Sequence, residues 1–243
     1  MQAVHIGTSG YSYDHWKGRF YPESLRPDGF FAHYARFFDT VEINYSFYHI
    51  PTRKQVASWK RMAPEGFLFS LKAPKKITHT MRLQNASGLT RAFIWQAKDL
   101  AEHLGIFLFQ LPPSFAADLA LLEEFLSSLP LKYRYAFEFR HDSWLVEPVY
   151  VMLRERNMAL CLADNPDLVP PDIATADFVY FRMHGHSQWV NYCYSEDELR
   201  LLAARVIRHL DSNREVFVYF NNDANVYAVA NARRLQELLL HGL

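Results

Sequence analysis

Short apolar runs alternate with longer amphipathic segments about eight times along the chain. A short apolar run is typical of a buried strand, and a longer amphipathic segment is typical of a helix. Several of the apolar runs end in charged or amide residues, namely FLFSLK at Lys72, IFLFQ at Gln110, YAFEFR at Arg140, VYFRMH at His184 and VFVYFNND at Asp223. The pattern therefore predicts repeated strand-then-helix units whose strands end in polar side chains.

Capping signals and prolines set the boundaries of these elements. Thr52 with Gln55, and Ser195 with Glu198, have the spacing of a capping box, which opens a helix. We expect strands at 3–8, 40–48, 67–72, 105–113, 135–140, 158–164, 177–185 and 216–221. We expect helices at 28–38, 55–63, 87–104, 118–129, 143–157, 198–210 and 227–240. The segment 165–177 has too many prolines for a full helix, so the sixth crossover is predicted to be degenerate.

Eight such units favour a (β/α)8 barrel over an open doubly wound sheet, which commonly has about five or six strands. The 243 residues, of which 50% are hydrophobic, are enough for one large core. We therefore expect an α/β fold, a single TIM-type barrel domain over residues 1–243. The early GTSG lacks the third glycine of a dinucleotide fingerprint and is followed by aromatics, so no nucleotide cofactor is expected.

The composition of the chain limits the classes of binding partner that we expect. Lys plus Arg number 26 and Asp plus Glu number 26, so no global basic field attracts nucleic acid and any anion site must be local. Cys161 and Cys193 lack metal-ligand spacing and are interpreted as free thiols. The chain shows no basic-then-apolar leader and no run near the ~18 apolar residues of a membrane span, so a cytoplasmic protein without a membrane partner is expected. The pattern leaves the oligomeric state open.

Side-chain alternation predicts which polar residues face the barrel interior. In a barrel the apolar set of each strand faces the helices, and the other set lines the inside. By this parity the interior receives Glu42, Asn44, Lys72, Gln110, Glu138, Arg140, Arg182 and His184. The strands predicted at 158–164 and 216–221 are apolar on both faces, but they end at Asp164, Asn221, Asn222 and Asp223. Because active sites of such barrels lie at the carboxyl ends of the strands, these residues form the candidate site.

A structural ion-pair network is the alternative interpretation of the same residues, because Glu and Arg can satisfy one another inside a barrel without chemistry. Hydrophobic replacements would often be as stable as such a network. An interior that collects this many charges is therefore costly if its role is packing alone. We favour a functional site over a purely structural one.

Seven segments resemble the YecE-like family, also called domain of unknown function 72. They are GTSGYSYDHWKGRFYP from Gly7, VEINYSFY from Val41, KAPKKITH from Lys72, FQLPPSF from Phe109, FEFRHDSW from Phe137, YFRMHG from Tyr180 and YFNNDANVYAVANA from Tyr219. The resemblance runs almost from end to end and implies a TIM-type barrel, but it supplies no established reaction. Tyr11 departs from the Trp that the family usually has there.

The family is also distantly similar to metal-dependent TIM barrels of the xylose isomerase and endonuclease-four group. Those barrels place carboxylates and histidines at the ends of late strands, where this chain has Glu138, Asp164, His184 and Asp223. Arg140 and Arg182 are positioned to neutralise these carboxylates, and histidines are few, although His49 and His79 could contribute. A bound metal is allowed by this likeness but is not favoured.

The leading hypothesis is an enzyme, a hydrolase, phosphodiesterase or isomerase, acting on a small anionic or phosphorylated substrate. Arg140, Arg182 and Lys72 would hold the anion, because guanidinium forks match phosphate and carboxylate oxygens. Glu138 or Asp164 would serve as general base and His184 as acid or base. The remaining candidates would orient or cover the substrate, namely Glu42, Asn44, Gln110, Asn221, Asn222, Asp223, Tyr11 and Trp16.

Two alternatives stay open. In a nucleic-acid-binding or repair-type phosphodiesterase, aromatics such as Tyr11, Trp16 and Tyr45 would stack on bases while nearby lysines contact phosphates. Net neutrality weighs against this hypothesis. A ligand-binding barrel without turnover is the third interpretation.

Overall fold

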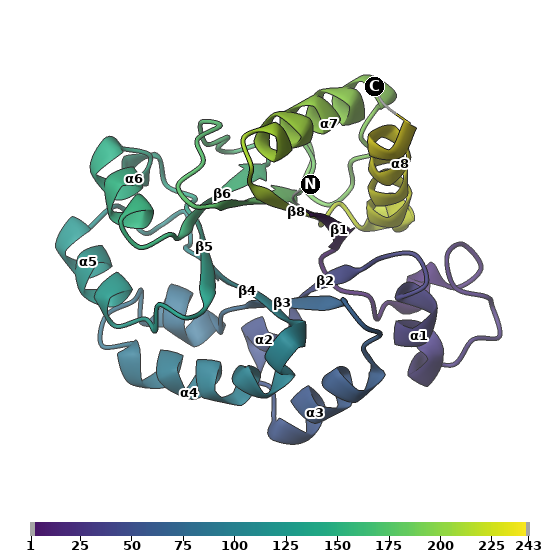
Figure 1. Ribbon diagram of the computed structural model, residues 1–243, viewed down its shortest axis with the longest axis horizontal. Helices are drawn as coiled ribbons and strands as arrows, with labels where there is room; N and C mark the ends of the chain where they lie inside the picture. The colour runs from purple at the N-terminus through teal and green to yellow at the C-terminus, as the bar shows by residue number, and fades with distance from the viewer. Residues whose placement is uncertain (1–2, 242–243) are drawn as a thin grey trace. The chain divides into compact units, whose positions relative to one another are not determined.

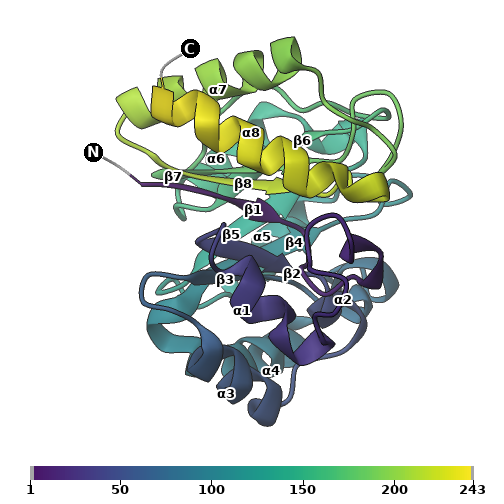
Figure 2. The same cartoon turned by 90° about the vertical axis from the view of Figure 1, so that its right-hand side faces the viewer.

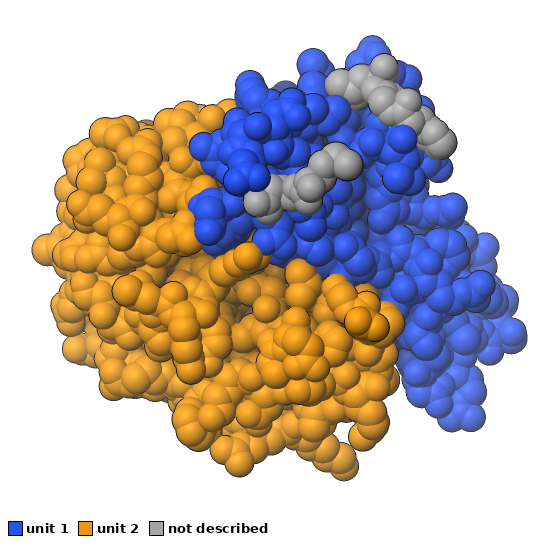
Figure 3. All heavy atoms as spheres, viewed as in Figure 1, with its two compact units in different colours: residues 1–42, 162–169, 177–243 blue, residues 43–161, 170–176 orange. Residues whose placement is uncertain are grey.

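The structure, a computed structural model, describes residues 3–241 and alternates eight strands with helices (Figure 1). Its contacts divide the chain into two compact units. Unit 1 comprises residues 1–42, 162–169 and 177–243, and unit 2 comprises residues 43–161 and 170–176 (Figure 3). Two of the boundaries fall inside strands, after Glu42 and after Cys161. The prediction of one domain is not tested by this division and stays a prediction.

In unit 1, parallel strands pair in the order β1–β8–β7. β1 is Val4–Thr8, β8 is Glu215–Phe220 and β7 is Phe178–Met183. Helix α8 (Tyr227–His241) packs against β1 and β8, and α7 (Glu196–Asp211) packs against α8 and β8 (Figure 2). The other elements are η1 (Asp14–Trp16), η2 (Pro27–Gly29), α1 (Phe30–Tyr34), the first part of β2 (Thr40–Ile43) and η6 (Ala224–Val226). A bridge from Ser9 to Glu42 joins the segment after β1 to β2.

In unit 2, parallel strands pair in the order β3–β4–β5–β6. β3 is Leu68–Lys72, β4 is Leu104–Gln110, β5 is Arg134–Glu138 and β6 is Ala159–Asp164. The helices of this unit are α2 (Tyr45–Tyr48), α3 (Arg53–Met62), η3 (Lys76–Thr80), α4 (Ser87–Ala97), η4 (Lys98–His103), α5 (Leu119–Ser127), η5 (Asp142–Trp144) and α6 (Glu147–Arg154). The register places Gln110 beside Glu138, so the polar ends of β4 and β5 are neighbours.

Both predicted capping boxes are confirmed. The Thr52 side chain accepts from the backbone of Gln55 at the start of α3, and Ser195 with Glu198 does the same at α7. The degenerate sixth crossover is confirmed as well, because residues 165–177, all of them described, contain no helix. These two signals are local, which is why sequence alone reveals them.

The strand predicted at 40–48 is too long, and this prediction is wrong in its second half. β2 ends at Ile43, and Tyr45–Tyr48 form the short helix α2. The Ser46 hydroxyl turns the chain there, because it donates to the carbonyls of Ile43 at 2.8 Å and Lys72 at 2.6 Å. The helices predicted at 28–38 and 143–157 are each divided into a 3-10 turn and a shorter α-helix.

Within residues 3–241, no helix is long and apolar enough to cross a membrane. This finding does not test the cytoplasmic location, which stays a prediction.

His5 on β1 predicts a pH-dependent stability. Its Nδ1 lies 2.7 Å from Asp39 and its Nε2 lies 3.0 Å from Glu215. Burial lowers the pKa of His5, but the two carboxylates outweigh it and raise this pKa to about 9. Since the folded pKa lies above the ordinary value, the stabilisation is fully present below about pH 6.5 and is lost as the pH rises through 9.

We expect the free energy of unfolding to fall by about 1–2 kcal/mol across this window, because solvent screens the half-exposed Asp39. Urea denaturation between pH 6 and pH 9.5 measures this fall. In His5→Asn the fall should disappear. An equal fall in wild type and variant would assign the pH dependence to other groups.

Candidate functional site

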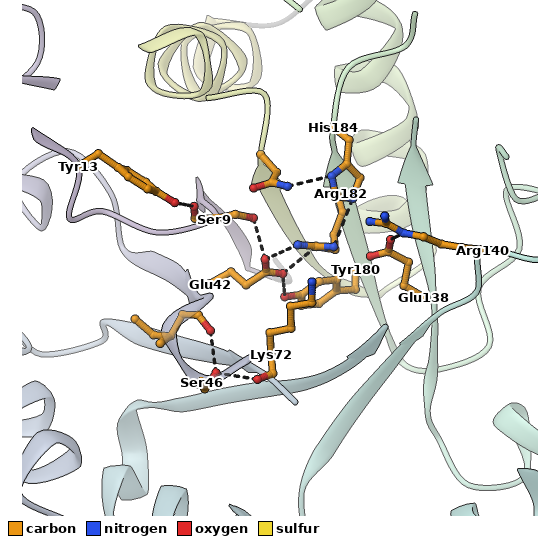
Figure 4. A network of polar contacts seen from close by, with 12 residues as sticks. Ser9, Tyr13, Glu42, Ser46, Lys72, Glu138, Arg140, Tyr180, Arg182 and His184 are labelled. Carbon is orange, nitrogen blue, oxygen red and sulfur yellow. Dashed lines mark hydrogen bonds and ion pairs between the residues drawn. The ribbon is translucent and has the colours of Figure 1, made fainter. Parts of the chain in front are cut away.

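The structure collects the candidate residues into two polar clusters, one in each unit. In unit 1, the Glu42–Arg182 cluster consists of Ser9, Glu42, Tyr180, Arg182, His184 and Asn221. In unit 2, the Lys72–Arg140 cluster consists of Lys72, His79, Glu138 and Arg140. Figure 4 shows the ion pair of each cluster.

A bidentate ion pair forms the centre of the first cluster. Arg182 Nη2 lies 2.6 Å from Glu42 Oε1, and Arg182 Nε lies 2.9 Å from Glu42 Oε2. Tyr180 and Ser9 also donate to this carboxylate, each at 2.7 Å. Burial raises the pKa of Glu42, but Arg182 and these hydrogen bonds outweigh it, so the pKa lies below its ordinary value. With both side chains at most 1% exposed, the pair orders the interior of unit 1.

His184 continues this network. Its Nε2 lies 3.2 Å from Arg182 Nη1, and its Nδ1 lies 2.9 Å from the amide of Asn221. A guanidinium only donates hydrogen bonds, so Nε2 accepts, and a neutral His184 carries its proton on Nδ1. The amide of Asn221 then accepts through its oxygen, the orientation that satisfies the network. The predicted acid–base role of His184 is not tested and stays a prediction.

Asp164 is paired with a histidine that sequence reasoning missed. The Tyr194 hydroxyl donates to Asp164 Oδ2 at 2.6 Å, and His186 Nδ1 lies 3.1 Å from Oδ1. This hydrogen bond and the charge of Asp164 raise the pKa of His186. The His186 side chain is 62% exposed. The signal in the sequence was a second histidine, two residues after His184.

Asn222 and Asp223, which follow β8, both contact neighbouring segments of unit 1. Asn222 donates to the Tyr192 carbonyl at 2.7 Å and to Asn231 at 2.8 Å. Asp223 accepts from Trp16 Nε1 at 2.8 Å. Burial raises the pKa of Asp223 to about 6, against the opposing effects of Trp16 and His15.

Trp16 and Tyr11 pack within the loop that follows β1. Trp16 is fully buried, with ring neighbours that include Tyr21 at 5.6 Å. Tyr11 lies edge-to-face on Phe31 at 5.3 Å. Their predicted contact with substrate is not tested and stays a prediction. In the structure both rings pack against other aromatic side chains.

In unit 2, Glu138 at the end of β5 is fully buried and orients Arg140. Its Oε1 accepts from Arg140 Nε at 2.6 Å. Lys72, at the end of β3, lies with its Nζ 4.1 Å from the centroid of the Phe47 ring. Gln110, at the end of β4, donates to the Leu111 carbonyl at 2.8 Å.

His79 lies near Lys72 and Arg140, close enough for both charges to act on its ring. Its Nδ1 is 2.8 Å from the Thr78 hydroxyl, and its ring lies edge-to-face on Phe47 at 5.0 Å. Burial lowers the pKa of His79 to about 4, and Lys72, Arg140 and Lys75 add to this lowering. His79 is therefore neutral at neutral pH, although the nearby Glu138 carboxylate opposes the effect of the cations. The sequence indicated His79 only as a possible metal ligand.

Asn44, at the start of α2, has a buried side-chain oxygen that accepts no hydrogen bond from the described residues. A buried acceptor of this kind is rare in a folded protein and normally has a water or ligand partner.

Within the part of the chain that the structure describes, no group of three or more His, Cys, Asp or Glu side chains is arranged to hold a metal ion.

Comparisons with other proteins agree with this architecture. The chain is 33% identical to a DUF72 family protein of Thermotoga maritima, whose crystal structure it matches with a TM-score of 0.89 over 98% of this chain and 100% of that one. A DUF72 family protein of Enterococcus faecalis matches the fold with a TM-score of 0.83 at 23% identity, over 99% of this chain and 96% of that one. These similarities confirm the predicted α/β TIM-type barrel.

Two curated relatives extend the comparison. The UPF0759 protein YecE of Escherichia coli K12 is 33% identical over 115 residues, which are 47% of this chain and 42% of YecE. That match therefore spans less than half of the relative. The UPF0759 protein YunF of Bacillus subtilis is 25% identical over 97% of this chain and 94% of YunF. The family model described as "Protein of unknown function DUF72" matches residues 5–242, so the chain belongs to the DUF72 family.

Proposed function

We propose that the protein is an enzyme that binds a small anionic or phosphorylated molecule at the Lys72–Arg140 cluster and acts on it by general acid–base chemistry. One observation carries the proposal. Lys72 at the end of β3 and Arg140 just after β5 both act on the same partly exposed imidazole, His79, and add to the lowering of its pKa by burial. Two cations that lie near one partly exposed position favour an anion there, and the Glu138 carboxylate offsets only part of their charge.

Arg140 and Lys72 would contribute to anion binding in different ways. Glu138 holds the guanidinium plane of Arg140 through Nε, and a fixed guanidinium matches the geometry of phosphate or carboxylate oxygens. Lys72 supplies a compact charge on a flexible stem that rests against Phe47. Glu138 is a weaker candidate for the general base than the sequence suggested, because its Oε1 already accepts a hydrogen bond from Arg140.

His79 is the acid–base group that we propose instead. A bound anion would offset the charges of Lys72 and Arg140, which removes part of the cause of the low pKa. The pKa of His79 would then move toward neutral pH, where a general base is most effective. In this scheme, binding of the substrate raises the pKa of His79 to a value at which the imidazole can act as a general base.

Calorimetric titration with inorganic phosphate tests the anion site. Lys72→Met and Arg140→Met should each weaken phosphate binding about tenfold, the size expected for one charged hydrogen bond. Lys54→Met removes an exposed charge on α3 and is the matched control, in which the affinity should be unchanged. NMR titration of His79 should show its pKa rising from about 4 when phosphate is added.

Two results would contradict the proposal. One is phosphate affinity that is the same in wild type, Lys72→Met and Arg140→Met. The other is a His79 pKa that phosphate leaves unchanged. Binding without conversion of any phosphorylated compound would instead favour the ligand-binding barrel without turnover.

A further inference from the structure

Helix α2 presents two aromatic rings to solvent. The Tyr48 side chain is 71% exposed and the Tyr45 side chain is 44% exposed. Both lie on one four-residue helix directly after β2. Packing explains Phe47, which contacts Lys72 and His79, but it does not explain why two tyrosines of the same turn remain this accessible.

These exposed rings are continuous with the Lys72–Arg140 cluster. Tyr48 lies edge-to-face on Phe47, with the ring centroids 5.1 Å apart. Phe47 in turn has Lys72 Nζ at 4.1 Å and the His79 ring at 5.0 Å. The Ser46 hydroxyl fixes the helix to β3 by donating to the Lys72 carbonyl. The exposed Tyr48 ring is therefore in direct contact with Phe47, the ring that both Lys72 and His79 contact.

A third observation lies at the start of the same helix. The buried side-chain oxygen of Asn44 accepts no hydrogen bond from the described residues. It immediately precedes Tyr45, so an unsatisfied acceptor, exposed rings and clustered cations occur on adjoining segments of unit 2. A ligand that has an anionic group, a flat ring and an N–H donor has a counterpart for each of these features.

We infer that the anion bound at the Lys72–Arg140 cluster carries a planar aromatic ring, as a mononucleotide does, and that this ring stacks on Tyr48. This inference rests on the proposed function and names the class of its substrate. Stacking on an aromatic side chain tolerates any base, because every base has a π-face. The ring supplies affinity, and the cations fix the phosphate end.

Calorimetric titrations with ribose 5-phosphate, adenosine monophosphate and phenyl phosphate separate the ring from the phosphate. Wild type should bind adenosine monophosphate about tenfold more tightly than ribose 5-phosphate. Tyr48→Ala should abolish this difference and leave ribose 5-phosphate binding unchanged, whereas Tyr48→Phe should keep the difference. Trp95→Ala is the matched control, because Trp95 is a comparably exposed aromatic of the same unit on α4.

Each outcome has a distinct meaning. Phenyl phosphate binding as tightly as adenosine monophosphate would support stacking and show that any aromatic ring suffices. Equal affinities of wild type for adenosine monophosphate and ribose 5-phosphate would overturn the inference and leave the proposed function standing. If ribose 5-phosphate does not bind to wild type at all, the proposed function itself fails. A dimer in size-exclusion chromatography that Tyr48→Ala dissociates, without an effect on nucleotide affinity, would assign the rings to an interface between copies and overturn the inference.

Discussion

Arg182→Met is expected to lower the free energy of unfolding by about 3–5 kcal/mol, the cost of leaving a buried charge without its partner. Glu42 is fully buried, and Arg182 supplies two of the four hydrogen bonds that it accepts. Without the guanidinium, the carboxylate keeps its hydrogen bonds from Tyr180 and Ser9 but loses its positively charged partner. Urea denaturation monitored by tryptophan fluorescence measures the loss.

The double variant Glu42→Leu with Arg182→Met is the matched comparison. Removing both charges should recover most of the loss, because a buried pair often contributes little compared with apolar residues of similar volume. The double-mutant cycle isolates the coupling between the two side chains. A double variant as unstable as the sum of its single variants would show that each charge is held by other groups. A large recovery would show that the ion pair contributes little net stability.

Trp16→Ala is expected to lower the free energy of unfolding by about 3–5 kcal/mol, as is usual when a large buried aromatic is truncated. The Trp16 ring is fully buried, with Phe20 at 5.4 Å and Tyr21 at 5.6 Å. Its Nε1 also donates to Asp223, so the variant leaves that carboxylate with fewer partners. Thermal and urea unfolding followed by circular dichroism check this expectation.

Trp16→Phe is the control, because it fills much of the volume and removes only the indole donor. It should lose about 1–2 kcal/mol. The sequence suggested that Trp16 covers a substrate, so the phosphate affinity of the folded variants separates the two roles. A Trp16→Ala protein that keeps its stability and loses phosphate affinity would support the substrate role and contradict the structural one.

The sequence predicted the elements well where the signals are local. The capping boxes at Thr52 and Ser195 and the prolines of 165–177 act over a few residues, and the structure confirms each of them. The prediction failed at Tyr45–Tyr48, whose aromatic residues favour a strand by propensity. Ser46 overrides that propensity with a hydrogen bond to Lys72, a residue on another strand, and no local pattern contains this information.

The candidate site was predictable as a set of residues but not as pairs. Strand parity indicated Glu42, Arg182, Glu138 and Arg140, and the structure places all four in ion pairs. Strand parity could not show that Glu42 pairs with Arg182, 140 residues away, because this pairing depends on how the strands are arranged in space. The sequence indicated His79 only as a possible metal ligand, since its lowered pKa arises from burial and from charges on other segments.

The way unit 1 is assembled affects the order in which the protein can fold during synthesis. Strands β3 to β6 of unit 2 are neighbours both in the chain and in the sheet, so each finds its partner soon after it is made. β1 pairs with β8, where Val4 is in register with Val216, so β1 is synthesised about two hundred residues before the strand with which it pairs. Such non-local pairing is slow and keeps strand edges exposed. While β8 is still unmade, the edge of β1 is therefore open to pairing with other chains.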